Sequence, residues 1–196
     1  MKVIVGLGNP GPEYAGNRHN MGFAAIDALA DKFRADISAR AHKALVGRAR
    51  LAGVEALLVK PHTYMNLSGN AVAPILSEMK AGPEDLIVVH DDIDLPLGSL
   101  RIRKAGGAGG QNGVASIIGA LGTDRFIRVK LGVGRPPAGV DPADHVLSCF
   151  SEDELPVARE VVGRAVEAVM AVLKEGPDRA MNRFNKNPER PDAAPD

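Results

Sequence analysis

The pattern of hydrophobic and polar positions along the chain predicts strands and helices in alternation. A β-branched run at residues 3–7 ends in Gly-Asn-Pro-Gly and is typical of a buried strand, as is the run at residues 86–89. Apolar residues recur at helical spacing in residues 21–34, 67–79, 114–121 and 157–173. Strands that alternate with helices in this way indicate an α/β layer fold.

Two further pairs of predicted strands indicate that the sheet is mixed rather than parallel. Residues 44–51 and 54–59 flank Ala52-Gly53, which is a typical hairpin connection. Residues 99–104 and 126–133 each alternate apolar with basic side chains, as expected for strands with one face in water. Hairpin-like pairs are antiparallel, so both pairs add antiparallel strands to the sheet.

Length and composition fit one globular domain of ordinary size. The chain has 196 residues, of which 45% are apolar and 24% charged. Aromatic residues make up only 4%, with no Trp, which disfavours a platform that stacks many bases. We therefore expect a single α/β domain over residues 1–185, with a mixed central β-sheet flanked by helices. Residues 186–196 are polar and proline-rich and are expected to form a disordered tail.

Charge and cysteine content exclude several other classes. The chain has 24 basic and 24 acidic residues, which excludes a wholly basic domain but leaves room for a local basic patch. The one cysteine, Cys149, excludes a disulfide scaffold, and its apolar neighbours predict a buried, inert thiol. No apolar run reaches membrane-spanning length and no signal peptide is evident, so we expect a cytoplasmic protein with no membrane partner.

Two glycine-rich segments differ in how well they support ligand binding. Residues 6–11 fit the G-x-G-x-x-G string of dinucleotide-binding folds, but Pro10 interrupts the helix that such a fold requires there. The acids that follow, Asp27 and Asp31, fall inside the first predicted helix rather than at the end of a strand, so we reject this interpretation. Residues 106–113 lack the Lys-Ser or Lys-Thr of a P-loop, but their five glycines favour close approach of the backbone to a ligand.

The acidic segment after the strand at residues 86–89 leaves a metal site open as an alternative. We expect residues 91–98 to form a loop, and Asp91, Asp92 and Asp94 could together hold Mg²⁺ for a phosphoesterase reaction. An acidic turn after a strand is the commoner explanation of such a segment. A serine hydrolase of the α/β-hydrolase type is disfavoured, because the chain has no G-x-S-x-G motif.

Several side chains suited to catalysis or binding follow the predicted strands. In chain order they are Asn9 and His19, Met65 and Asn66, Asp91, and Asn112, which is also placed to cap a helix. In open α/β sheets ligands bind outside the carboxyl ends of strands, so these side chains are expected to converge. A His can take a proton from water, an Asp can orient it, and Asn amides can donate to an oxyanion. Because no nucleophilic Ser or Cys is evident, this set suits hydrolysis of an ester by water.

A basic segment suggests that the substrate carries phosphate. Residues 101–135 contain seven basic side chains and a single acid, Asp124. Two neighbouring strands would present Arg103 and Lys130 close to the glycine-rich residues 106–113. A stripe of charge is often only a solvated face, but beside a candidate site phosphate binding is the better interpretation.

Five linked motifs resemble the bacterial peptidyl-tRNA hydrolases in order and spacing, from residue 1 to about residue 185. These motifs are Gly6-Leu7-Gly8-Asn9-Pro10-Gly11 with Tyr14, Arg18-His19-Asn20, Lys60-Pro61 with Tyr64-Met65-Asn66-Leu67-Ser68-Gly69, His90-Asp91-Asp92 with Asp94-Leu95-Pro96-Leu97-Gly98, and Gly109-Gly110-Gln111-Asn112-Gly113. The resemblance implies a monomeric esterase without metal or other cofactor. Its substrate would be peptidyl-tRNA, cleaved between the peptide and the 3′-terminal ribose to recycle tRNA after aborted translation.

The resemblance also implies roles for particular residues. The catalytic positions of the family fall on His19, its orienting Asp91, and Asn9. The substrate-binding positions are Tyr14, Met65, Asn66 and Asn112, and the positions that grip the tRNA phosphate are Arg103 and Lys130. This chain exchanges Lys-type and Arg-type side chains at the two phosphate positions, which keeps the charge but changes the geometry. It also has Gln111 where His is common in the family. A non-catalytic RNA-binding module is a further alternative, which the retention of all the matched polar positions disfavours.

Overall fold

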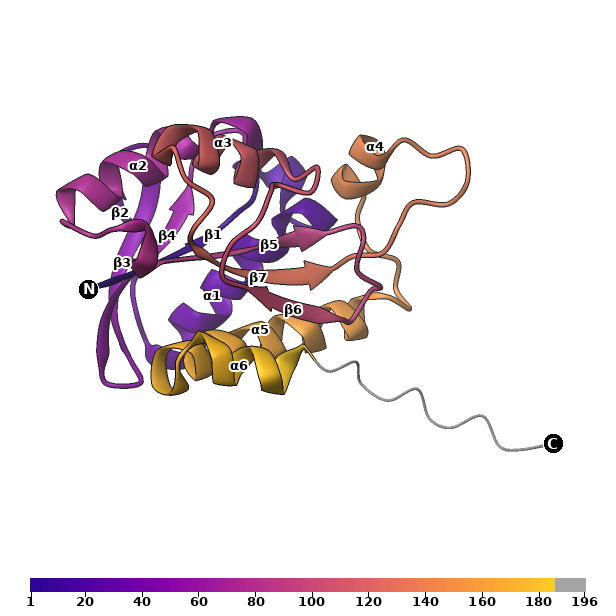
Figure 1. Ribbon diagram of the computed structural model, residues 1–196. Helices are drawn as coiled ribbons and strands as arrows, with labels where there is room; N and C mark the ends of the chain where they lie inside the picture. The colour runs from indigo at the N-terminus through magenta and orange to yellow at the C-terminus, as the bar shows by residue number, and fades with distance from the viewer. Residues whose placement is uncertain (186–196) are drawn as a thin grey trace.

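Seven strands form one mixed sheet through the centre of the molecule (Figure 1). The computed structural model describes residues 1–185. The strands are β1 (Lys2–Gly6), β2 (Ala39–Ala41), β3 (Ala44–Leu51), β4 (Val54–Pro61), β5 (Leu86–Asp92), β6 (Leu100–Arg103) and β7 (Ile127–Gly132). Their order across the sheet is β2-β3-β4-β1-β5-β7-β6, in which β4, β1, β5 and β7 are mutually parallel. The pairs β2–β3, β3–β4 and β6–β7 are antiparallel. The predicted mixed sheet is therefore confirmed.

Helices cover both faces of the sheet. They are α1 (Met21–Phe33), α2 (Gly69–Glu78), α3 (Asn112–Leu121), α4 (Pro142–Leu147), α5 (Leu155–Glu175) and α6 (Pro177–Phe184). Helices α2 and α3 lie on one face and α1, α5 and α6 on the other, while α4 stands at the edge where β5 and β7 end (Figure 1). None of the helices in the described part of the chain has both the length and the apolar content needed to cross a bilayer.

The sheet separates two hydrophobic cores, which explains the continuous apolar runs in its central strands. In β1, Ile4 packs with the α1–α5 side, whereas Val3 and Val5 pack with the α2–α3 side. All three side chains are fully buried. A strand that is covered on both faces needs apolar residues at every position, so the β-branched run correctly predicted β1.

One predicted loop is wrong at its beginning. Asp91 and Asp92 are the last two residues of β5, where they pair in register with Leu131 and Gly132 of β7. The pattern missed this because carboxylates rarely occupy a buried strand, and both side chains here are buried against specific partners. The chain therefore leaves the sheet after Asp92, three residues later than the hydrophobic pattern indicates.

The predicted cap of α3 is also wrong by one residue. The side-chain oxygen of Gln111 accepts the Val114 N–H at 2.9 Å, so Gln111 is the N-cap and Asn112 is the first helical residue. The amide of Asn112 is therefore not used by the backbone. It is left exposed at the start of the helix.

Two short elements were not predicted from the sequence, and one side chain that was predicted to be buried is exposed. Strand β2 has only three residues, and α4 only six, too few for a periodic pattern. The start of α4 does carry a local signal, because the Asp141 side chain accepts the Ala143 N–H at 2.7 Å and Pro142 follows the cap. Cys149 is exposed rather than buried. The tail predicted for residues 186–196 lies outside the described residues.

A close contact between α1 and the sheet positions the segment just before this helix. A Cβ built on Gly22 would lie 2.4 Å from both the Leu7 nitrogen and the Val89 oxygen, so only glycine allows this approach. The Phe23 N–H also donates to the Leu7 carbonyl at 3.2 Å. The short 3₁₀ turn η2 (Arg18–Asn20) is thereby held against the ends of β1 and β5.

Candidate active site

The parallel strands β1, β4 and β5 end at the same edge of the sheet, and a cavity of about 620 Å³ opens there. The side chains that line it include seven residues that the sequence predicted for catalysis or substrate binding: Asn9, Tyr14, His19, Met65, Asn66, Asp91 and Asn112. The structure therefore brings these seven positions together. Arg103 and Lys130, predicted to bind phosphate, are not among the lining residues.

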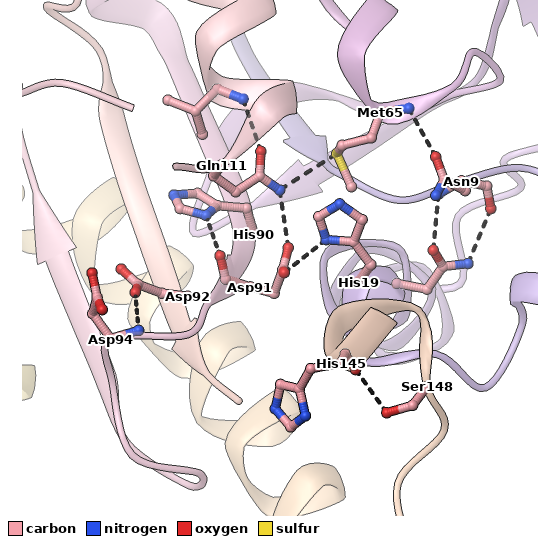
Figure 2. A network of polar contacts seen from close by, with 12 residues as sticks. Asn9, His19, Met65, His90, Asp91, Asp92, Asp94, Gln111, His145 and Ser148 are labelled. Atoms are coloured by element: carbon pink, nitrogen blue, oxygen red, sulfur yellow. Dashed lines mark hydrogen bonds and ion pairs between the residues drawn. The ribbon is translucent and has the colours of Figure 1, made fainter. Parts of the chain in front are cut away.

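His19 and Asp91 form a buried pair at the floor of this cavity (Figure 2). The Nδ1 atom of His19 lies 2.7 Å from Oδ2 of Asp91, and the two residues are 8% and 2% exposed. An ionised carboxylate can only accept a hydrogen bond, so the Nδ1 atom carries the proton in this contact. The other ring nitrogen, Nε2, then keeps its lone pair, and it has no partner within residues 1–185. This arrangement suits a general base.

Asn9 is fixed so that its amide nitrogen is left to donate. Its Oδ1 atom accepts the Met65 N–H at 2.8 Å, which determines the orientation of the amide. The Asn9 backbone makes two hydrogen bonds with the side chain of Asn20, at 2.8 and 3.0 Å. Within the described residues, Nδ2 of Asn9 has no partner. A fixed amide donor beside His19 can stabilise negative charge that develops on a substrate oxygen.

The other two asparagines stand at the mouth of the cavity. Asn66 and Asn112 are exposed, and neither side chain makes a hydrogen bond to another part of residues 1–185. Tyr64, which is 61% exposed, and Leu147 of α4 add apolar surface to the lining. The cavity thus combines free amide groups with an apolar wall, which is the usual composition of a site for an organic substrate.

Sequence reasoning missed two polar residues that support the site. Asn20 holds the backbone of Asn9, as described above, and Gln111 donates from Nε2 to Oδ1 of Asp91 at 2.9 Å. Each is next in the sequence to a residue that was predicted, His19 or Asn112. Their burial is the signal that the sequence does not carry, because Asn20 and Gln111 are each only 7% exposed.

The carboxylates of the acidic segment do not point toward a common site. Asp91 contacts His19, Asp92 forms an ion pair with Lys130, and Asp94 accepts from Arg135 at 2.7 Å. His90 is buried and its Nδ1 contacts the Asp91 carbonyl at 2.7 Å, while desolvation lowers the pKa of its imidazole. Within residues 1–185 no three His, Cys, Asp or Glu side chains are grouped as metal ligands.

The basic side chains lie on one face of the β6–β7 pair, next to the cavity. Register pairs Arg101 with Lys130 and Arg103 with Arg128, so all four occupy the face opposite the α5–α6 core. Arg128 is buried and donates to the Gly107 and Asp124 carbonyls, each at 2.8 Å. Desolvation lowers the pKa of its guanidinium. Arg103 is exposed, and Lys130 pairs with Asp92 of the cavity wall.

Comparison with known proteins identifies the family. The family model described as Peptidyl-tRNA hydrolase matches residues 3–192. The chain belongs to the peptidyl-tRNA hydrolase family. A peptidyl-tRNA hydrolase of Koribacter versatilis is 49% identical over 98% of this chain and 96% of its own length, and one of Agathobacter rectalis is 50% identical over 94% and 100%. The family predicted from the five motifs is therefore confirmed.

Solved structures of peptidyl-tRNA hydrolases share the fold. The enzyme of Acinetobacter baumannii superposes with a TM-score of 0.89 at 33% identity, over 94% of each chain. A peptidyl-tRNA hydrolase in complex with N-propanol gives a TM-score of 0.88 at 34% identity. The α/β fold with a mixed central sheet is thus the fold of the family.

The neighbour of His19 anchors the turn that carries it. Arg18 is buried, its Nη2 atom lies 2.6 Å from Oε2 of Glu154, and its Nε atom donates to Ser148 Oγ at 3.3 Å. Its guanidinium also stacks on the Phe150 ring at 4.6 Å. The hydrogen bond from Arg18 is the main reason that the pKa of Glu154 falls from 4.5 to about 2. Turn η2 is thereby tied to the start of α5.

We expect Glu154→Gln to destabilise the fold at neutral pH but not in strong acid. Because the folded state lowers the pKa of Glu154, its ionised form stabilises the protein above pH 4.5, and this contribution is lost as the pH falls toward about 2. Urea unfolding of wild type and variant between pH 7 and pH 2 measures the difference. Glu152→Gln, which changes an exposed acid nearby, is the control and should show no such convergence. A pH-independent difference would contradict the role of the ion pair.

Proposed function

We propose that this chain hydrolyses the ester between the peptide and the 3′-terminal ribose of peptidyl-tRNA, which releases both after aborted translation. Membership of the family supports the substrate. The observation that carries the mechanism is the 2.7 Å contact between His19 and Asp91 inside a cavity lined by three asparagines. His19 is the general base, Asp91 orients it, and water is the attacking group.

The proposed reaction proceeds in two steps. Nε2 of His19 takes a proton from water while the water oxygen attacks the ester carbonyl carbon, and Asp91 stabilises the imidazolium that forms. The carbonyl oxygen becomes an oxyanion, which accepts hydrogen bonds from the asparagine amides, with Nδ2 of Asn9 as the main donor. The intermediate then expels the ribose oxygen, which receives the proton from His19.

The size of these effects suits an ester. General-base assistance accelerates such a reaction by about 10²–10⁴-fold. A single oxyanion donor contributes about 3 kcal/mol. An alkoxide leaves more readily than an amine, so the same site needs less acid assistance for an ester than for a peptide bond. This difference would leave the peptide itself intact while the ester is cleaved.

We assign the remaining predicted positions to substrate binding. Tyr14 and Met65 line the cavity together with Asn66 and Asn112, and these four would contact the peptide and the terminal adenosine. Arg103 and Lys130 would bind phosphate of the tRNA from the neighbouring β6–β7 face. Lys130 then has to share its ammonium between Asp92 and the phosphate, which is compatible with its partly exposed position.

The proposal includes no metal and no partner subunit. The carboxylates of the acidic segment are each engaged by a different basic side chain, which supports a metal-free reaction. We propose that the chain acts as a monomer, as the resemblance to the family implies.

We expect His19→Ala to abolish hydrolysis of an N-acetylated aminoacyl-tRNA, with a loss of at least about 10²-fold because the base is removed. Asp91→Asn should cost less, although still a large factor, because the orientation of the imidazole is lost. Peptide release is measured under single-turnover conditions, with and without chelator, and circular dichroism checks that each variant is folded.

Each outcome of this assay has a definite meaning. Near-normal turnover of folded His19→Ala would overturn the assignment of the base. Loss of wild-type activity on chelation would support the metal-dependent alternative centred on the acidic segment. Tight binding of the substrate by wild type without any release of peptide would indicate an RNA-binding module.

We expect Arg103→Gln or Lys130→Gln to weaken tRNA binding and to reduce its salt dependence. Each lost phosphate contact should lower the slope of log affinity against log salt by about 0.7–0.9. Binding is measured at several salt concentrations, and cleavage of a small N-acetylated ester serves as the second assay. Arg48→Gln, an exposed change on β3 far across the sheet, is the control. Equal losses on tRNA and on the small ester would contradict a phosphate contact.

A further inference from the structure

The buried side chain of Gln111 links the start of α3 to the His19–Asp91 pair (Figure 2). Its Nε2 atom donates to Oδ1 of Asp91 at 2.9 Å, and its Oε1 atom accepts the Val114 N–H at 2.9 Å. The same Nε2 atom lies 3.4 Å from Sδ of Met65. Gln111 is 7% exposed, so these contacts are shielded from water.

The helix start determines which way the Gln111 amide points. A backbone N–H can only donate, so the atom that faces Val114 has to be the oxygen of the amide. The nitrogen is therefore the atom that faces Asp91, and the amide cannot turn over without breaking both hydrogen bonds. The N-cap of α3 thus delivers a donor of fixed orientation to the carboxylate.

Both oxygens of Asp91 are consequently occupied by donors. His19 Nδ1 contacts Oδ2 and Gln111 Nε2 contacts Oδ1, so the plane of the carboxylate is fixed from two sides. A buried carboxylate without its second donor would be both freer to rotate and more basic. A more basic carboxylate holds the proton on His19 more strongly and makes the imidazolium a weaker acid.

We propose that Gln111 is a positioning residue that acts through Asp91, holding its carboxylate toward His19 and limiting how strongly it stabilises the imidazolium. This inference rests on the proposed function, because it assumes that His19 is the base. An amide has no proton to gain or lose near neutral pH, so this support is the same at every pH at which the pair works.

Two variants separate this role from helix capping. Gln111→Glu keeps an oxygen to accept the Val114 N–H, but it replaces the donor to Asp91 with a negative charge. Gln111→Met has a similar length and removes both contacts. If Gln111 only capped α3, Gln111→Met would lose stability but keep the kcat and the acid limb of wild type, and the added charge of Gln111→Glu would move the acid limb without lowering kcat.

We expect kcat to fall by about 10- to 100-fold in both variants, the range that loss of a hydrogen-bond partner of a ligating side chain costs at metal sites. KM should change less than kcat, because Gln111 acts on Asp91 rather than on substrate. The acid limb of the kcat/KM profile should move to higher pH in both variants, and further in Gln111→Glu, because extra negative charge stabilises the imidazolium. The other titratable residues that line the cavity are common to all variants: Tyr14, Tyr64, His90, Asp92 and Asp141.

Gln111→His is the rescue variant, because an imidazole N–H can again donate to Asp91. It should recover most of the lost kcat and bring the acid limb back toward its wild-type position. The assay is steady-state hydrolysis of an N-acetylated aminoacyl-tRNA from pH 5 to pH 9, with thermal melts of each variant.

The outcomes distinguish this inference from the proposed function. If wild type itself does not hydrolyse the substrate, the proposed function fails. If wild type is active and folded Gln111→Glu and Gln111→Met retain its kcat and its acid limb, the inference about Gln111 is overturned and the mechanism stands. A lowered kcat together with a shifted acid limb in folded Gln111→Met, which adds no charge, supports the proposal. If Gln111→Met does not fold, the kcat of Gln111→Glu decides, because its added charge moves the acid limb whatever the role of Gln111.

Discussion

A carboxylate kept inside the protein beside an imidazole is the constraint on which this site depends. Burying an unpaired charge is costly, so Asp91 can remain at 2% exposure only because donors meet both of its oxygens. Those donors come from segments far apart in the sequence: His19 from the turn before α1, Gln111 from the start of α3. The close packing of Gly22 and the ion pair of Arg18 hold the first, and the N-cap geometry holds the second.

Much of the fold could be predicted from the sequence, because its central strands are covered on both faces. Ile4 and its neighbours have to be apolar whichever core they enter, so the run that contains them identifies β1. The same rule failed at Asp91, where a strand residue carries a charge that only tertiary partners make tolerable. Strand β2 and helix α4 are too short for periodicity to reveal, although Asp141-Pro142 marks where α4 begins.

Strand direction explains why most of the site residues lie together, but it does not explain the position of Asn112. β1, β4 and β5 are parallel, so their carboxyl ends meet, as predicted for Asn9, Met65 and Asp91. β6 is antiparallel to β7, so its end points away, and the glycine-rich loop brings the chain back to the cavity. Gln111 could not have been assigned from sequence, because its role depends on which buried carboxylate faces its amide. The chemical roles of all these residues stay predictions.

The most direct test of the central claim is the tautomer of His19 in solution, read from ¹⁵N–¹H correlation spectra of the imidazole ring. At a pH where the ring is neutral, the account predicts a protonated Nδ1 and an unprotonated Nε2 in the wild-type protein. In Asp91→Asn this preference should be lost. A wild-type ring that carries its proton on Nε2 would leave no lone pair on that nitrogen to accept a proton from water, and would contradict the account.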